Sequence, residues 1–242
     1  MTNKYLAIHN DIVRQIEAGD IAPHSLLPSE HELKEHYDTS RETIRKALTL
    51  LAQNGYIQKV QGKGSIVIRS SKVDFPVSGL VSFKELAGRM GEKPRTLVHE
   101  LSRGKPDAYV KQQLNLSGKD EVWKVVRIRE FGGGKVLLDK DYLNARFVPS
   151  LTREICENSI YEYLEDELGL KISFAKKEIV VEEPTEEDKQ LLDLEGFHNM
   201  VVIRNYVYLE DASLFQYTES RHRPDKFRFV DFARRIHSSS GA

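Results

Sequence analysis

Two arginines two positions apart, Arg127 and Arg129, lie in a run of apolar residues that is typical of a β-strand. Side chains two apart in a strand point to the same face, so both guanidinium groups are expected on one side. Charges held on such a face need carboxylate partners or an anionic guest, and arginine binds phosphate with two parallel hydrogen bonds. Two interpretations stay open: a network of cross-strand ion pairs, or a site for a small anion.

Further polar side chains alternate along the neighbouring predicted strands. Asp139 and Asp141 share a face of the next strand, and two later strands carry Arg204, Tyr206, Tyr208, Tyr217, Glu219 and Arg221. We expect one surface of the sheet to collect these arginines, carboxylates and tyrosines. Carboxylates accept hydrogen bonds from sugar hydroxyls and aromatic rings cover apolar sugar faces, so the set suits a small polar ligand.

A second concentration of charge lies in the first third of the chain. Residues 40–72 contain seven basic residues and one acidic residue, although the whole chain has a net charge of −1. Arg41, Arg45 and Lys46 fall outside the apolar stripe of a predicted helix, close to its first turn. The first turn of a helix in the major groove usually meets the base edges. An ordinary solvated helix face is the alternative.

Apolar spacing and capping signals predict three helices around these basic residues. They run from about 4 to 18, from Ser29 to about 37, and from Thr39 to a stop at Gly55, with capping-box spacing at Ser29–Glu32 and Thr39–Glu42. Two β-branched runs, 56–60 and 65–69, follow and predict a hairpin with Lys63 at its tip. Three helices and a hairpin form a winged helix-turn-helix, whose expected partner is double-stranded DNA.

The remaining patterns predict a larger second domain. Strands are expected at 122–131, 135–144, 172–181, 200–209 and 214–222, with helices at 81–90, at 151–168 and after the Thr185–Asp188 cap. Hairpin connections imply a mainly antiparallel sheet with helices packed on it, so the fold class is α+β. We place a winged helix-turn-helix at 1–70, a linker at 71–77, an effector and dimerisation domain at 78–236, and a disordered tail at 237–242.

Several kinds of chemistry are not supported by the sequence. Cys156 is the single cysteine, which excludes an internal disulfide and indicates a reducing compartment. His31 and His36 are five apart and diverge by roughly 140° on a helix, so they do not form a zinc site. The first residues lack a signal peptide and no apolar run spans a bilayer. We expect a cytoplasmic protein without a cofactor, metal or membrane partner.

The N-terminal segments resemble a known family. Residues 27–30, 40–48, 54–57 and 62–65 resemble the DNA-binding domain of GntR-type bacterial transcription regulators, although Asp38 stands where glycine is common and Glu42 places an acid beside Arg41. From the helix face, the hairpin and this resemblance we expect the following residues to contact DNA: Ser29, Ser40, Arg41, Thr43, Arg45, Lys46, Lys59, Gln61, Gly62, Lys63 and Gly64.

The second domain resembles the UTRA effector domain of the HutC subgroup, a fold related to chorismate lyase. Residues 75–86, 138–142, 155–163, 215–223 and 227–235 resemble trehalose operon repressors of Gram-positive bacteria, which implies trehalose 6-phosphate as effector. The resemblance assigns the phosphate to Ser82, Phe83, Lys84, Arg127 and Arg129 and the sugar hydroxyls to Asp139 and Glu219, and it also matches Ser159. Strand facing adds Asp141, Tyr206 and Arg221.

Together these expectations describe a homodimeric repressor that binds a palindromic operator and is released by trehalose 6-phosphate. Two alternatives remain. The effector could be another phosphosugar, such as an amino-sugar phosphate. The chain could instead be an enzyme that acts on a small anionic substrate, but no nucleophile or metal motif supports one, and we do not expect an enzyme.

Overall fold

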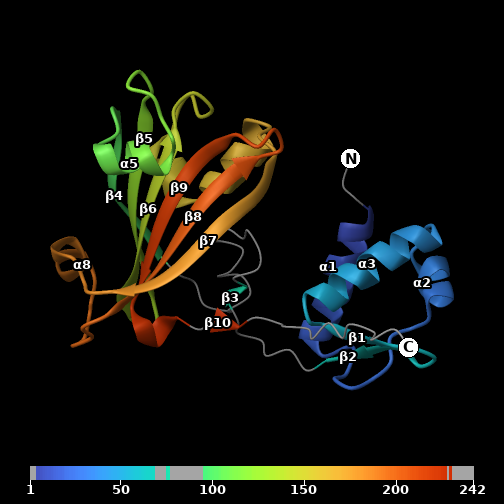
Figure 1. Cartoon of the computed structure of the whole chain (residues 1–242). Coiled ribbons are helices and arrows are strands. Elements are labelled where there is room, and N and C mark those ends of the chain that lie inside the picture. Colours follow the sequence, from blue (N-terminus) through green and yellow to red (C-terminus); the bar gives the residue numbers. More distant parts are fainter. Residues whose placement is uncertain (1–3, 69–74, 77–94, 228, 231–242) are drawn as a thin grey trace, which may run out of the picture. The chain divides into compact units, whose positions relative to one another are not determined.

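The structure is a computed structural model that describes residues 4–68, 75–76, 95–227 and 229–230 (Figure 1). The chain divides into two compact units, one of Met1–Ser78 with Val230–Ala242 and one of Gly79–Phe229. The predicted helix at 81–90, with Ser82, Phe83 and Lys84, lies outside the described residues, as does the tail at 237–242.

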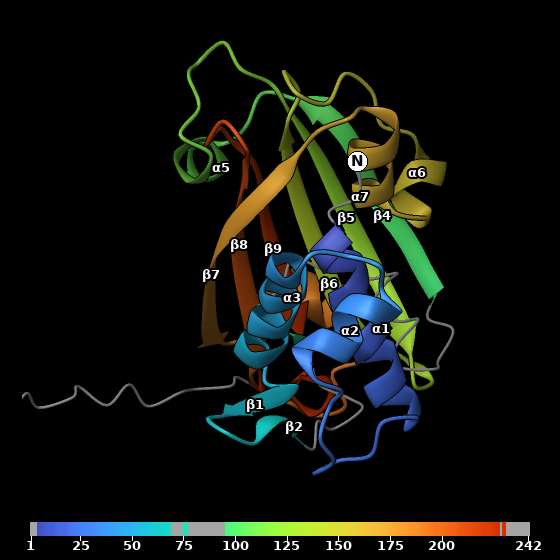
Figure 2. The same ribbon diagram turned by 90° about the vertical axis from the view of Figure 1, so that its right-hand side faces the viewer.

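The first unit is the predicted winged helix-turn-helix. It contains α1 (Lys4–Ala18), α2 (Glu30–His36), α3 (Arg41–Gln53) and the antiparallel strands β1 (Ile57–Val60) and β2 (Gly64–Val67) (Figure 2). The apolar stripes of α1 and α3 meet in one core, in which Ile12, Ile44 and Leu51 are almost fully buried. This core fixes which face of α3 remains in contact with solvent.

The start of α3 differs from the prediction by one residue. The N-cap is Ser40, whose Oγ accepts from the backbone N–H of Thr43 at 3.2 Å, so the predicted Thr39–Glu42 capping box is wrong. Asp38 adopts a left-handed conformation with φ of 42°. The backbone N–H of Thr39 donates to the Lys34 carbonyl at 3.2 Å. The backbone N–H of Thr39 therefore closes the last turn of α2, and Ser40 is the first residue that can cap α3.

The second unit is built on a six-stranded antiparallel sheet with the order β4-β5-β6-β9-β8-β7. Its strands are β4 (Arg95–Gly104), β5 (Val122–Phe131), β6 (Gly134–Asn144), β7 (Ile172–Glu182), β8 (Met200–Leu209) and β9 (Leu214–His222). The predicted fold class, α+β with a mainly antiparallel sheet, is confirmed. A separate two-stranded sheet joins β3 (Phe75–Pro76), inside the predicted linker, to β10 (Phe229–Val230).

Helices cover both faces of the sheet. On one face, α6 (Arg153–Glu157) and α7 (Ile160–Glu162) pack on Val125, Leu143 and Val207. We call this the α6 face. On the opposite face, α5 (Ala108–Gln113) lies beside Tyr217 (Figure 1). On the same face, α8 (Glu186–Leu191) lies beside Val126, Leu138 and Val202. We call this the α8 face.

Three features of this unit were not predicted. The strand β4 and the helix α5 were missed altogether. The single helix expected at 151–168 is wrong, because α6 ends at Glu157 and α7 starts again at Ile160, followed by a π-helical turn at Tyr163–Glu167. Asn158 has φ −85° and ψ −93°, and Ser159 caps α7 by accepting from the Glu162 N–H at 3.3 Å. Asparagine and serine side chains compete for backbone hydrogen bonds in this way and interrupt helices.

Candidate functional site

The strand register divides the predicted polar set between the two faces of the sheet. Residues directly opposite each other in antiparallel strands share a face. Arg127 is opposite Asp139, and Asp139 is opposite Ser220, on the α6 face. Glu219 is opposite both Lys140 and Arg204, on the α8 face. The expectation that one surface collects all these residues is therefore wrong: Tyr206, Glu219 and Arg221 lie on the face opposite to Arg127, Arg129, Asp139 and Asp141.

The α6 face holds two buried arginine–aspartate pairs. Arg127 Nη2 donates to Asp141 Oδ2 at 2.6 Å, and Arg129 Nε donates to Asp139 Oδ2 at 2.9 Å. All four residues are less than 9% exposed. The predicted cross-strand ion pairs are therefore present, and two guanidinium groups lie side by side in the interior. Such charges are retained only where each is paired and hydrogen-bonded.

Neighbouring groups complete this cluster. Ser220 Oγ donates to Asp139 Oδ1 at 2.7 Å, and Gln216 Nε2 donates to Asp141 Oδ1 at 3.1 Å. Arg127 Nη1 also donates to the backbone carbonyl of Cys156 in α6, at 3.3 Å. Both aspartates thus accept from two side chains each, and the sheet is connected to the helix layer through Arg127. Ser159, the buried N-cap of α7, lies in the same helix layer.

Burial and neighbouring charge shift the pKa values of this cluster. Desolvation, together with the charge of Arg127, lowers the pKa of Arg129 to about 10. Burial opposes ionisation of Asp139, but Arg129, Arg127 and the Ser220 hydroxyl outweigh it, so the Asp139 pKa is lowered. Burial raises the pKa of Asp141, which Asp139 reinforces. An anion that reaches this cluster would meet two cations already balanced by two carboxylates.

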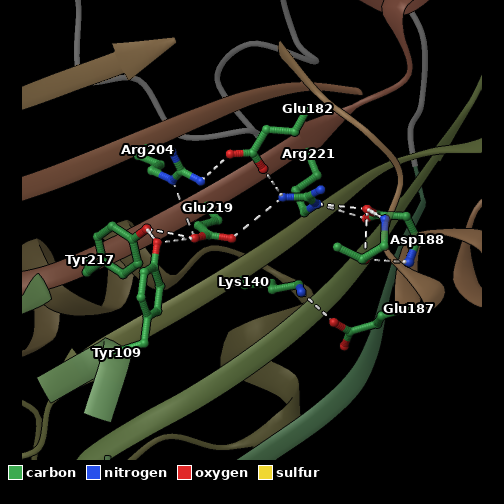
Figure 3. Close-up of polar contacts among 10 residues, drawn as sticks. Tyr109, Lys140, Glu182, Glu187, Asp188, Arg204, Tyr217, Glu219 and Arg221 are labelled. Atoms are coloured by element: carbon green, nitrogen blue, oxygen red, sulfur yellow. Dashed lines mark hydrogen bonds and ion pairs between the residues drawn. The ribbon is translucent and has the colours of Figure 1, made fainter. Parts of the chain in front are cut away.

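A second polar network occupies the α8 face, and Figure 3 shows its members pointing toward one another. Glu219 Oε1 accepts from the hydroxyls of Tyr109 at 2.8 Å and Tyr217 at 2.7 Å. Arg221 Nε donates to Asp188 Oδ1 and Oδ2 at 3.0 and 2.9 Å. Burial and the hydrogen bonds with Tyr109 and Glu219 raise the pKa of Tyr217. These contacts attach α5 and α8 to β9.

Glu182 completes the network between two arginines. Its Oε2 accepts from Arg221 Nη1 at 3.1 Å, and its Oε1 accepts from Arg204 Nη2. The remaining predicted residue, Tyr206, donates to Gln113 Oε1 of α5 at 2.7 Å. Sequence reasoning missed Tyr109, Glu182 and Asp188. The Thr185–Asp188 capping box did locate the start of α8, but a cap gives no sign of the ion pair with Arg221.

The predicted DNA-contact residues of α3 lie on its solvent side. The side chains of Arg41, Arg45 and Lys46 are 71%, 58% and 61% exposed. Glu30 at the start of α2 reaches two of them, with Oε2 at 2.9 Å from Arg41 Nε and 3.4 Å from Arg45 Nε. The hydrogen bond from Arg41 lowers the pKa of Glu30 although burial opposes this. The first unit therefore presents three exposed cations on α3, and one carboxylate orients the two arginines among them.

The other predicted DNA-contact residues extend this surface. The hairpin tip is exposed, with Gly62 and Gly64 at φ values of 76° and 103°, and Lys63 stands between them. Lys59 Nζ donates to Thr49 Oγ1 at 3.0 Å. Four other predicted residues are Gln61, which is exposed, Ser29 and Ser40, which are exposed N-caps, and Thr43, which is partly buried. DNA contact by this set stays a prediction.

Neither a metal site nor a membrane span is found in the parts of the chain that the structure describes. No group of three or more histidine, cysteine, aspartate or glutamate side chains in these parts could hold a metal ion. None of the helices in the described ranges has both the length and the apolar character needed to cross a bilayer. Cys156 is buried, and burial raises its thiol pKa to about 11.

Comparison with known proteins covers both units. Residues 4–67 match the model for bacterial regulatory proteins of the gntR family, and residues 89–228 match the UTRA domain. The chain is 60% identical over 233 residues to the HTH-type transcriptional regulator TreR of Bacillus subtilis (strain 168), covering 96% of this chain and 98% of the relative. It is also 29% identical to the mannosyl-D-glycerate transport/metabolism system repressor MngR of Escherichia coli (strain K12), over 96% of each chain.

Solved structures show the same relationship. The possible transcriptional regulator YydK of Bacillus subtilis is similar with a TM-score of 0.78 and 27% identity, over 96% of this chain and 99% of that chain. The effector binding domain of the B. subtilis trehalose repressor (TreR) is 59% identical with a TM-score of 0.56, over 59% of this chain and 99% of that chain. These relatives are transcriptional regulators and not enzymes. The chain therefore belongs to the GntR family of bacterial regulatory proteins, with a UTRA domain after its DNA-binding domain.

Proposed function

We propose that this protein is a cytoplasmic, homodimeric repressor that binds a palindromic operator and releases it when trehalose 6-phosphate occupies the UTRA domain. The observation that carries the effector assignment is the buried cluster on the α6 face, where Arg127 and Arg129 supply two guanidinium groups beside Asp139 and Asp141. Guanidinium groups bind phosphate and carboxylates accept sugar hydroxyls. Trehalose as the sugar follows from similarity to the B. subtilis trehalose repressor effector binding domain.

The strand register supports a division of the predicted effector residues between the two faces of the sheet. Arg127, Arg129, Asp139, Asp141 and Ser159 belong to the α6 face or its helix layer and form the proposed ligand site. Tyr206, Glu219 and Arg221 engage α5, α8 and neighbouring strands instead. Their role is to hold the sheet and its helices together. Ser82, Phe83 and Lys84 remain part of the proposed phosphate site.

On the DNA side, the exposed arginines of α3 and the glycine-flanked Lys63 form the proposed operator surface. Exposed cations neutralise phosphates and release counterions, so binding should weaken steeply as salt rises. The effector can cause release of the operator only if the effector binds more tightly to dimers in which the spacing of the two winged helix-turn-helix units no longer matches the half-site spacing. The domain limits that we propose are 1–70 for the winged helix-turn-helix, 71–77 for the linker and 78–236 for the effector and dimerisation domain.

The decisive experiment measures operator binding with and without effector. Fluorescence anisotropy of a labelled palindromic operator duplex at physiological salt should show tight binding by the full chain and release by trehalose 6-phosphate. Trehalose, inorganic phosphate, glucose 6-phosphate and glucosamine 6-phosphate serve as comparison ligands. Unchanged operator affinity at saturating trehalose 6-phosphate would contradict the proposal, and release by glucosamine 6-phosphate alone would replace the effector with an amino-sugar phosphate.

A further inference from the structure

We infer that Gln216 and Asn205, which the sequence patterns did not select, are sugar-reading residues of the effector site. This inference rests on the proposed function and deepens it. Both residues lie on the α6 face: Gln216 is opposite Leu143, and Asn205 is opposite Thr218, which is itself opposite Asp141. They extend the arginine–aspartate cluster from β6 across β9 to β8, so that charged groups lie at one end and neutral amides at the other.

The orientation of the Gln216 amide is determined by its neighbour. Gln216 is 1% exposed, and its Nε2 donates to Asp141 Oδ1 at 3.1 Å, while the other oxygen of Asp141 accepts from Arg127. A carboxylate in an ion pair accepts hydrogen bonds, so the amide nitrogen faces Asp141 and the amide oxygen points elsewhere. That oxygen, Oε1, is buried and has no hydrogen-bond partner.

Two further polar atoms of the same face share this property. Asn205 Nδ2 donates to Thr218 Oγ1 at 2.8 Å, and Asn205 Oδ1 is buried without a partner. Arg127 Nε is likewise buried without a partner. A buried polar atom without a hydrogen bond has lost its contact with water and gained nothing in return, and native structures contain few such atoms. Three such atoms lie on the α6 face, in or beside the arginine–aspartate cluster. Their position indicates that a ligand forms the missing hydrogen bonds.

The chemistry of the three atoms matches a phosphosugar. Arg127 Nε is a donor suited to a phosphate oxygen, and the two amide oxygens are acceptors suited to sugar hydroxyls. On the α8 face, the buried side-chain atoms of the described residues that lack a hydrogen bond are Arg204 Nε and Arg221 Nη2, and both are donors. Arg204 Nε also lies 3.6 Å from Glu219 Oε1. The α6 face is therefore the side on which a hydroxyl-bearing anion finds both donors and acceptors.

The test separates hydroxyl recognition from phosphate binding. Isothermal titration calorimetry of the full chain with trehalose 6-phosphate is compared for the wild type, Gln216→Met and Asn205→Ser, with inorganic phosphate as a competing ligand. Each substitution should weaken trehalose 6-phosphate binding by about tenfold or more, since a site that hydrogen-bonds a hydroxyl loses that contact. The inhibition constant of inorganic phosphate should stay within about twofold, because the phosphate contacts the arginines.

A matched variant controls for changes in the sheet. Tyr206→Phe removes the hydroxyl that donates to Gln113 on the α8 face, and it should leave trehalose 6-phosphate affinity unchanged. Wild-type affinity in both Gln216→Met and Asn205→Ser would overturn the inference, and so would an equal loss of phosphate binding, which would show an action through Arg127. A wild-type protein that does not bind trehalose 6-phosphate would instead overturn the proposed function together with this inference. Asn205 is partly exposed, so its replacement by serine should disturb folding less than a change at the buried Gln216. The Asn205→Ser variant therefore keeps the test valid if Gln216→Met does not fold.

Discussion

Two pairs of arginines in this protein have carboxylate partners but opposite surroundings. Arg41 and Arg45 on α3 share Glu30, and their side chains are 71% and 58% exposed. Arg127 and Arg129 on β5 pair with Asp141 and Asp139, and their side chains are 9% and 4% exposed. Exposed ion pairs contribute about 0–1 kcal/mol and exchange readily for phosphate, whereas separating a buried pair leaves an uncompensated charge. The difference suits the first pair to a polyanion and the second to one selected ligand.

The largest effect is expected from breaking a buried pair. Arg127→Ala leaves Asp141 without its counter-charge and should lower the free energy of unfolding of the second unit by roughly 3–5 kcal/mol. Urea unfolding followed by Trp123 fluorescence measures this, since Trp123 is the single tryptophan and donates to the Val148 carbonyl at 2.9 Å. Arg45→Ala is the matched control and should change that free energy by less than about 0.5 kcal/mol. Equal losses in both variants would show that burial does not distinguish the two pairs of arginines.

The buried environment also predicts a dependence on pH. Burial lowers the pKa of His222 to about 4 from 6.5, although Asp139 opposes the shift. A histidine that is neutral in the folded state contributes stability above pH 6.5 that is lost as the pH falls toward 4. Stability of the second unit should therefore fall by roughly 2 kcal/mol between pH 7 and pH 5. His222→Gln should flatten the Trp123 unfolding profile in this window, and an unchanged profile would exclude His222 as its source.

The exposed pair should affect DNA binding and not stability. Arg45→Ala should weaken operator binding by about tenfold and reduce the slope of log K against log salt by about 1, because one phosphate contact is lost. Anisotropy titrations at several salt concentrations measure both quantities. Trehalose 6-phosphate affinity is measured in parallel and should remain at the wild-type value. A loss of effector binding in Arg45→Ala would contradict the separation of the two charged sites.

The smallest effect is expected from the carboxylate that orients the α3 arginines. Glu30→Gln removes a negative charge beside Arg41 and Arg45 and should tighten binding to non-specific duplex by a few-fold at low salt. The preference for the operator over non-specific DNA should fall, because both guanidinium groups become less restrained. Glu35→Gln is the control, because the Glu35 carboxylate lies 3.4 Å from His31. This variant should leave the ratio of operator affinity to non-specific DNA affinity unaltered.

Much of this architecture could be predicted from the sequence. Apolar periodicity located α1, β5, β8 and β9 with their observed limits, and the glycines at 132–134 placed Arg127 and Asp139 on one face through a short turn. The relative phase of β6 and β9 could not be predicted, because no turn joins them and their register depends on tertiary packing. That missing phase is why Glu219 was assigned to the wrong face. Gln216 and Asn205 escaped notice because neutral amides give no signal in a charge pattern.

The alternation along β9 has a consequence for folding. Ser220 and Gln216 serve one face while Glu219 and Arg221 serve the other. A shift of the β9 register by one residue would place Glu219 on the α6 face beside the arginine–aspartate pairs. The same shift would place Arg221 on the α6 face, away from Asp188. Sliding it by two residues would keep the faces but separate Arg221 from Asp188. Charge complementarity on both faces of the sheet thus disfavours pairings of β9 in the wrong register. A strand of the same length with only apolar side chains would not have this specificity.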